Sequence, residues 1–309
     1  MNAEIEAVVC IPSFRRPEGL REILGSLARQ DAVTRFAVVV VDNDAERREA
    51  LPVAEAFFTS ELTGLAVVEA QQGNVHAINT AFATAMRRYP AARYFLMVDD
   101  DERAEPGWLD AMVAVAKSND AQIVGGPVRR AYSASTSEAV SRHPLFHSIE
   151  APTGPIAIIH GSGNCLIARA VFEKLGAPYF DPAFNFLGGG DMDFFTRARA
   201  AGFAFAWAAD AVVWETVGTE RLSAGWIMRR SLRTGAINYA IDRKRRPGFG
   251  GWLTLAAKNI VSLLRGAFRF VRILVATRRI LPAGHWVLMP LGRVLASFGW
   301  STAPYKAAA

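Results

Sequence analysis

The first 98 residues alternate apolar runs of strand length with segments that carry apolar residues at helical spacing. Continuous apolar strands separated by amphipathic helices are typical of a parallel sheet covered by helices on both faces. The expected strands are 7–12, 36–41, 65–69 and 94–98, and the expected helices are 17–30 and 73–88. The sequence therefore predicts an α/β fold with a mostly parallel central sheet flanked by helices.

Polar side chains follow three of these strands at the point where each strand ends. They lie at 13–16 after the first strand, at 42–44 after the second and at 99–102 after the fourth. Because ligands of such sheets bind at the carboxyl ends of the strands, we expect these side chains to line one site.

Asp99, Asp100 and Asp101 are three adjacent carboxylates at the end of a buried strand. They repel one another, so a cation or several hydrogen-bond donors must offset their charge. A divalent ion such as Mg²⁺ or Mn²⁺ suits them, since Mg²⁺ is commonly held by one or two protein carboxylates together with substrate phosphates. A solvated acidic turn is the alternative, but the position after an apolar strand favours the metal site.

Asp42 ends the neighbouring strand, where it could accept hydrogen bonds from a base or a ribose. Asp-Asn-Asp is equally good turn chemistry, so both interpretations stay open. Farther along, three glycines precede Asp191 at the start of an expected helix over 191–201. Asp191 could cap this helix, or it could be the general base that takes a proton from an attacking hydroxyl.

Three further polar features have weaker interpretations. Asn164 ends a short turn and could line a sugar pocket or only stabilise the turn. Asn79 lies on a helix face, three residues after a histidine, where both could reach one ligand or form a surface pair. Trp226, Arg229 and Arg230 could clamp a diphosphate, because arginine binds phosphate through paired hydrogen bonds, or they could form a surface stripe.

In this order the motifs resemble glycosyltransferase family 2, and most of all its bacterial exopolysaccharide subgroup of succinoglycan-type glucosyltransferases. The matching stretches, between residues 7 and 235, are Cys10-Ile11-Pro12-Ser13-Phe14-Arg15-Arg16-Pro17, Val40-Val41-Asp42-Asn43-Asp44, the helix with Asn79, Val98-Asp99-Asp100-Asp101-Glu102, Pro106-Gly107-Trp108-Leu109, Gly125-Gly126-Pro127-Val128, 188–195 and 220–230. The resemblance implies the GT-A fold of nucleotide-diphospho-sugar transferases, a UDP-sugar donor and a divalent cation.

The resemblance also implies a role for each matching position. The donor nucleotide would be bound by Pro12, Ser13, Arg15, Asp42, Asn79, Asp99 and Asp100. The metal ion would lie on Asp101 and Asp99, and Asp191 would be the catalytic base. From the residue types themselves, and not from the resemblance, we expect contacts to the sugar, the acceptor or the diphosphate from Asn164, Gly189, Gly190, Trp226, Arg229 and Arg230.

Two positions depart from the family pattern, and one motif is missing. Gly190 stands where the family's Glu-Asp motif has its glutamate, and the family's Ala-Arg-Asn reads Ala77-Ile78-Asn79. The Gln-x-x-Arg-Trp motif of processive synthases does not occur in the sequence. We therefore expect one sugar to be added per encounter.

Charge divides the chain into an expected GT-A catalytic domain, 1–242, and a basic tail, 243–309. The tail holds twelve Lys and Arg and no acid, whereas the whole chain has a net charge of +6, so the catalytic domain is acidic. In an expected amphipathic helix between 252 and 279, one face carries Lys258, Arg265, Arg269, Arg272 and Arg279. Such a helix indicates an anionic membrane surface as partner, with docking on the catalytic domain as the alternative. The tail is too apolar for an arm that only tracks nucleic-acid phosphates.

Together these features predict an inverting, non-processive transferase. It would move a hexose, glucose by resemblance, from a UDP-sugar to a hydroxyl of a lipid-linked saccharide in exopolysaccharide or cell-surface glycan synthesis. The acidic N-terminus has no secretory signal pattern and two cysteines form no disulfide framework, so we expect a peripheral protein at the cytoplasmic face of the inner membrane. The alternatives are a membrane-bound scaffold with a decayed site, favoured by Gly190, and a sugar-phosphate nucleotidyltransferase, disfavoured because no glycine-rich loop follows the first strand.

Overall fold

The computed structural model describes residues 4–133 and 136–300, which form two compact units. Of the described residues, unit 1 comprises 4–129, 148–185 and 190–216, and unit 2 comprises 130–133, 136–147, 186–189 and 217–300. The division expected at residues 242/243 stays a prediction, and this point lies inside the continuous helix α8 (Ala224–Arg245) of unit 2.

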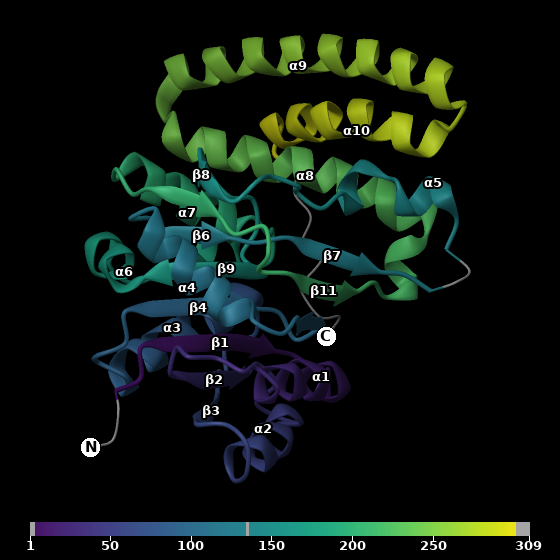
Figure 1. The fold of residues 1–309 in the computed structure, drawn as a ribbon. Coiled ribbons are helices and arrows are strands. Elements are labelled where there is room, and N and C mark those ends of the chain that lie inside the picture. Colours follow the sequence, from purple (N-terminus) through teal and green to yellow (C-terminus); the bar gives the residue numbers. More distant parts are fainter. Residues whose placement is uncertain (1–3, 134–135, 301–309) are drawn as a thin grey trace. The chain divides into compact units, whose positions relative to one another are not determined.

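Unit 1 is built on an eight-stranded sheet with the strand order β3-β2-β1-β4-β9-β6-β10-β8 (Figure 1). The four strands expected from the sequence are parallel neighbours: β1 (Ala7–Ser13), β2 (Phe36–Asp42), β3 (Gly64–Val68) and β4 (Tyr94–Val98). The remaining strands are β6 (Ile123–Gly125), β8 (Gly154–Ile156), β9 (Asn164–Ala168) and β10 (Phe205–Trp207). β9 is antiparallel to both β4 and β6, and β10 is parallel to β6, so the predicted mostly parallel sheet is confirmed.

Helices cover both faces of this sheet because its strands are apolar on both sides. Successive residues of a strand point to opposite faces, and alternate residues of β1 accordingly enter two different cores. One core contains α1 (Pro17–Ala28), α2 (Ala50–Phe58) and α4 (Trp108–Ser118). The other contains α3 (Asn74–Arg88), α6 (Arg169–Leu175) and α7 (Gly190–Ala200). The 3₁₀ turn η2 (Pro182–Phe184) precedes α7.

A second, three-stranded sheet has the order β5-β11-β7, with β5 (Glu102–Ala104), β11 (Val213–Thr216) and β7 (Val128–Ala131). β5 begins directly after the acidic triplet, so the triplet forms the turn between β4 of the large sheet and β5 of the small one. This turn places the three carboxylates at the carboxyl end of β4, as the sequence predicts.

Unit 2 is mainly helical and contains the expected C-terminal amphipathic helices. Its elements are α5 (Glu138–Ser141), η1 (Pro144–Phe146), η3 (Thr219–Leu222), α8, α9 (Gly248–Thr277) and α10 (Ile280–Ser297). α10 packs against both α8 and α9 and lies between them in Figure 1. Gly235 of α8 and Gly292 of α10 permit this close approach, because a Cβ at either position would lie within 2 Å of a carbonyl oxygen of the other helix. None of the helices in 4–133 or 136–300 is both long and apolar enough to cross a membrane.

Candidate functional site

The carboxyl ends of β1, β2 and β4 bring three polar clusters together at one edge of the large sheet. Ser13, the last residue of β1, is the register partner of Asp42, the last residue of β2. The Ser13 hydroxyl donates to Asp100 Oδ2 at 2.9 Å, and the Phe14 backbone N–H donates to the same oxygen at 3.2 Å. The first strand–helix loop is therefore bonded directly to the acidic triplet.

Asp100 is an internal anchor of this loop. The Arg16 guanidinium donates to Asp100 Oδ1 at 3.1 Å and to Asp101 Oδ2 at 2.7 Å, and Asp100 is only 5% exposed. Asp100 is thereby held by the protein itself, and the nucleotide contact expected for it stays a prediction. Arg16 was not among the expected site residues, although it lies beside Arg15 in the same polar cluster.

Helix α1 also packs its backbone against the triplet. A Cβ added to Gly19 would come 2.2 Å from the carbonyl oxygen of Asp100, so only glycine fits at this point of the helix. The backbone of α1 therefore lies directly against the backbone of the triplet.

Asp99 and Glu102 place two carboxyl groups side by side. Burial, followed by the charges of the next two aspartates, raises the pKa of Asp99 to about 8. The Glu102 carboxylate accepts a hydrogen bond from the Asp99 backbone N–H at 2.9 Å, and burial raises its pKa well above the ordinary value. A Cβ on Gly163 would lie 2.7 Å from Glu102 Oε1 and 3.0 Å from Asp99 Oδ2, so both groups face the same glycine.

Glu215 adds a further carboxyl group to this cluster. It is the cross-strand partner of Glu102 in the antiparallel pair of β5 and β11. Like charges directly opposite each other on neighbouring strands are destabilising. The sequence analysis did not predict Glu102 or Glu215 as site residues. The one signal for them in the sequence is a single acidic residue within each of two short strands.

The donor set of this cluster fits a hard divalent cation. Among the described residues, no three His, Cys, Asp or Glu side chains are gathered closely enough to hold a metal ion by themselves. Mg²⁺ rarely needs such a cage, since it usually combines one or two carboxylates with substrate phosphates and water. Asp99 and Asp101 could provide the carboxylates, and the local excess of acid is the charge that such an ion would offset.

Asp42 and Arg15 form hydrogen bonds within and to the turn between β2 and α2. Asp42 is buried, and its two carboxylate oxygens accept hydrogen bonds from the backbone N–H groups of Asp44 and Ala50, which places it at the start of α2. Asp42 thus makes turn contacts, and the contact to a base or ribose expected for it stays a prediction. Arg15 Nε donates to Asp44 Oδ2 at 2.6 Å, and this bond lowers the pKa of Asp44. Pro12 is buried within β1.

Asp191 lies beside the same glycine-containing turn as Asp99. It is the second residue of α7, in a first turn where negative charge is favourable, and its Oδ1 accepts from the Met192 backbone N–H at 2.8 Å. A Cβ on Gly161 would lie 3.9 Å from Asp191 Oδ2. Because Gly161 and Gly163 belong to one turn, the expected base and the expected metal-binding residue flank the same short segment of unit 1.

Asn164 is buried in the core and hydrogen-bonded there, and the sugar contact expected for it stays a prediction. Its Oδ1 accepts from Trp108 Nε1 at 2.8 Å, and its Nδ2 donates to the backbone oxygens of Pro127 and Ala211 at 3.0 and 2.7 Å. Asn164 is buried and already paired at both ends of its amide.

Two other expected residues support the loop that leads to α7. Asn79 pairs with the backbone of Phe180 through both ends of its amide, with two bonds of 2.8 Å, and so holds this loop; its expected contact to the donor stays a prediction. Gly190 is buried, and a Cβ on it would lie 3.1 Å from Val75 and 3.5 Å from Phe180. Side chains of Val75 and Phe180 therefore fill the space next to position 190, where the family has a glutamate side chain.

The remaining expected residues belong to unit 2. Gly189 has a φ of +86°, and a Cβ there would meet Ile237 at 2.2 Å. Trp226 stacks on Phe146 with ring centroids 6.1 Å apart. Arg229 is exposed and Arg230 is half-buried. Their expected contacts to diphosphate or acceptor stay predictions.

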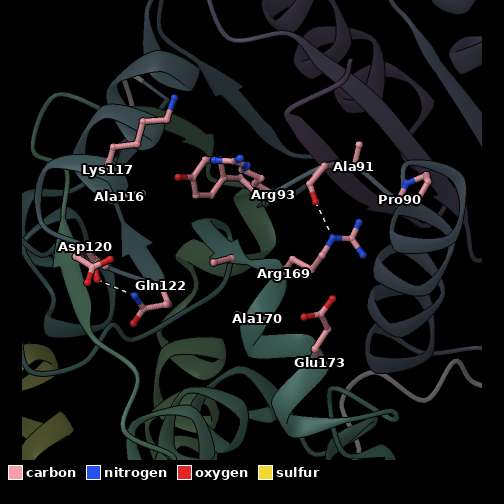
Figure 2. A pocket seen from close by; sticks show the side chains of 14 residues that line it. Pro90, Ala91, Arg93, Ala116, Lys117, Asp120, Gln122, Arg169, Ala170 and Glu173 are labelled. Atoms are coloured by element: carbon pink, nitrogen blue, oxygen red, sulfur yellow. Dashed lines mark hydrogen bonds between the residues drawn. The ribbon is translucent and has the colours of Figure 1, made fainter. Parts of the chain in front are cut away.

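A shallow depression of about 430 Å³ lies elsewhere on unit 1 (Figure 2). It borders the amino-terminal end of β4, opposite the end that carries the acidic triplet. Two of its basic groups are paired: Lys117 contacts Glu6 at 2.8 Å, and Arg169 donates to the backbone oxygen of Ala92 at 2.7 Å. The carboxylate edge, and not this depression, is therefore the candidate site.

Comparison with known proteins identifies the family. Residues 8–176 match the family described as Glycosyl transferase family 2, and residues 94–304 match Glycosyl transferase family group 2. The chain is 32% identical over 238 residues to the succinoglycan biosynthesis protein ExoM of Rhizobium meliloti, which covers 76% of this chain and 74% of ExoM.

Two solved structures share its fold. The mannosyltransferase PcManGT from Pyrobaculum calidifontis, in complex with GDP-Man and Mn²⁺, has a TM-score of 0.63 at 20% identity over 96% of this chain and 87% of PcManGT. TarS 1–349 of S. aureus, in complex with UDP, has a TM-score of 0.53 at 16% identity over 96% of this chain and 92% of TarS 1–349. The family match includes the strand ends that carry the acidic triplet, and with this agreement between motifs and fold the chain belongs to glycosyl transferase family 2 and has the GT-A fold.

Proposed function

We propose that this glycosyltransferase is an inverting, non-processive enzyme. It transfers a hexose, glucose in the first instance, from a UDP-sugar to a hydroxyl of a lipid-linked saccharide in exopolysaccharide or cell-surface glycan synthesis. The similarity to a succinoglycan biosynthesis protein and the UDP complex of TarS 1–349 support this assignment. The observation that carries it is the placement of Asp99 at Gly163 and of Asp191 at Gly161, two glycines of one turn.

In this proposal Asp101 and Asp99 hold a divalent cation, Mg²⁺ or Mn²⁺, together with the donor diphosphate. When bound, the ion supplies positive charge to the departing diphosphate. The Mn²⁺ in the PcManGT complex supports the use of such an ion. Arg16 orients Asp101, and Ser13 and Phe14 hold Asp100 so that the whole triplet keeps its position.

Asp191 is the general base of the proposed reaction. It takes the proton of the acceptor hydroxyl while that oxygen bonds to the anomeric carbon and the bond to the diphosphate breaks. One displacement with one base inverts the configuration at that carbon. Because glycine replaces the glutamate at position 190, Asp191 supplies the carboxylate that remains of the family's Glu-Asp motif.

The proposed location is the cytoplasmic face of the membrane, to which the protein binds peripherally. An anionic membrane surface and a lipid-linked acceptor are its partners there. The basic composition of residues 243–309 supports this placement, because twelve cations without one acid favour an anionic surface.

Calorimetric titration with UDP, with and without Mn²⁺, tests the metal-dependent site. We expect tight binding only with the ion, and turnover in a screen of UDP-, GDP- and dTDP-sugars to be highest with a UDP-hexose. Absence of metal-dependent binding would favour the scaffold with a decayed site over the enzyme.

A pair of substitutions separates the two proposed roles. Asp191→Asn should reduce transfer by a factor on the order of 10² to 10⁴ while UDP still binds, because a base acts on the acceptor. Asp101→Asn should instead remove the Mn²⁺-dependent part of UDP binding. If Asp191→Asn weakens UDP binding as much as it slows transfer, Asp191 is not the base.

A further inference from the structure

Helix α9 turns a long apolar face toward solvent. Of its thirty described residues, it buries only Leu255, Asn259 and Gly266. Among the described residues of the whole chain, fifteen large hydrophobic side chains are exposed, and nine of them are on this helix. These nine are Phe249, Trp252, Leu253, Ile260, Val261, Leu264, Phe268, Val271 and Val275. Single exposed apolar residues are ordinary in soluble proteins, but such a concentration marks an interaction surface.

Six of these residues form one continuous row, which we call the α9 row: Leu253, Ile260, Leu264, Phe268, Val271 and Val275. Their spacings of seven, four, four, three and four residues keep them on one side of a helix. Leu264, Phe268 and Val275 are 68%, 70% and 75% exposed. An amphipathic helix of a globular protein normally turns its apolar side to the core, and α9 does the reverse.

Contacts within unit 2 hold α9 in this orientation. Asp242 of α8 accepts from Lys258 Nζ of α9 at 2.6 Å and pairs with Arg293 of α10 at 2.9 Å. Arg293 is 5% exposed and donates from Nε to Asn259 Oδ1 of α9 at 3.1 Å. The guanidinium of Arg269 lies 4.5 Å from the centroid of the Trp286 ring of α10.

The residues of α9 that make these polar contacts point away from the α9 row. Rotating the helix to bury the row would break the Lys258–Asp242 ion pair and the hydrogen bond between Asn259 and the buried Arg293, which is costly. The outward position of the row is therefore part of the folded unit.

Basic side chains flank the row. Arg265 and Arg272 are exposed, and α9 contains neither Asp nor Glu. Apolar residues on the outer side with arginines along the flank are the pattern of a helix that lies in the interfacial layer of a membrane. A second copy of the chain is a poorer occupant, because two such faces would bring their arginines together.

We propose that the α9 row is the membrane-docking surface of this protein, with the row in the upper acyl region of an anionic bilayer and Arg265 and Arg272 at the headgroup phosphates. The proposal deepens the membrane placement proposed above. It does not depend on the catalytic assignment, because the surface belongs to unit 2 and its test needs no donor sugar.

Sedimentation of the full chain with vesicles tests the proposal. We expect binding to vesicles of phosphatidylcholine mixed with phosphatidylglycerol, and much weaker binding to phosphatidylcholine alone. The double variant Leu264→Glu/Phe268→Glu should lower the partition coefficient at least about tenfold, since each side chain loses the gain from leaving water and gains a repelled charge. Val33→Glu is the matched control, because Val33 is 92% exposed on unit 1 and should not enter the membrane.

Urea unfolding in solution, without vesicles, shows that the double variant is folded, and donor hydrolysis reports separately on the proposed function. Unchanged vesicle binding by the double variant, or an equal loss in Val33→Glu, would overturn the proposal. Conversion of a dimer into a monomer by the double variant, without any vesicle binding by the parent chain, would assign the row to a second copy instead.

Selective labelling gives an independent readout. Both natural cysteines are buried, so an introduced cysteine can be labelled with a polarity-sensitive dye. Dye emission should shift to the blue on anionic vesicles for Phe268→Cys and stay constant for Val33→Cys. Constant emission at both positions would contradict insertion of the α9 row.

Discussion

Glu102 of β5 and Glu215 of β11 are direct cross-strand partners, although both side chains are acids. Glu102 is also buried beside Asp99, and burial raises the pKa of both carboxyl groups. Each like-charged neighbour lowers the stability of the folded protein. Such a group of neighbouring carboxyl groups is therefore expected where they bind a ligand. In a family 2 glycosyltransferase, a cation together with a diphosphate is consistent with that ligand.

Two substitutions at Glu102 separate its charge from its hydrogen bond. Glu102→Gln should leave the free energy of unfolding of the metal-free protein unchanged or higher, because the amide oxygen can still accept from the Asp99 N–H while one acid disappears. Glu102→Ala should lower it by about 1–3 kcal/mol, because that N–H loses its acceptor. Urea unfolding measures both, and equal losses would show that the carboxyl group itself is required.

Gly19 should be intolerant of alanine, whereas Gly25 in the same helix should accept it. A Cβ at Gly19 would collide with the Asp100 carbonyl oxygen at 2.2 Å, so we expect a loss of about 1–3 kcal/mol and slower transfer. A Cβ at Gly25 would meet mainly the flexible end of Arg29 at 3.3 Å, and alanine there should gain up to about 1 kcal/mol of helix propensity. Urea unfolding of both variants checks this, and equal effects would exclude the contact with Asp100.

Restoring the family's glutamate should not improve this enzyme. In Gly190→Glu the new side chain starts 3.1 Å from Val75 and 3.5 Å from Phe180, in a packed wall. We expect lower thermal stability and no gain in sugar transfer, with a smaller loss in Gly190→Ala. A stable Gly190→Glu variant with higher turnover would mean that the loop before α7 opens to accept the acid.

Unit 2 should lose stability in mild acid through two buried histidines. The rings of His143 and His285 lie 5.3 Å apart, and burial lowers the pKa of each from 6.5 to about 4, for His143 with help from the charge of His285. Between about pH 6.5 and pH 4 the unfolded chain binds protons that the folded unit excludes, so stability falls as the pH falls through this window.

The groups around these two rings do not reverse the expected loss of stability at low pH. Ser231 pairs with His285 at 2.9 Å, His147 further lowers the pKa of His143, and Glu138 of the neighbouring α5 is paired with Arg279. Protection factors of the 280–297 amides, corrected for intrinsic exchange, should drop from pH 7 to pH 5 in the parent chain. They should drop less in His285→Gln, and an identical drop would assign the acid response to other groups.

The sequence by itself determined the sheet edge and what gathers there. The apolar runs that became β1 to β4 are local patterns, and the polar residues that follow them must meet once the strands are parallel. The same motifs also identify the family and the GT-A fold. Their order along the chain can be recognised without knowing what each side chain contacts.

Only the tertiary structure decided what each polar side chain contacts. Asp42, Asn79 and Asn164 carry the same chemical groups whether they bind a ligand or a neighbouring backbone, and their partners lie far away in sequence or on other elements. The pairing of Glu102 with Glu215 depends on strand register, which residue types alone do not reveal. The outward face of α9 likewise depends on an ion pair with α8 and on a hydrogen bond and a cation–π contact with α10, because periodicity gives a helix two sides without saying which one meets the core.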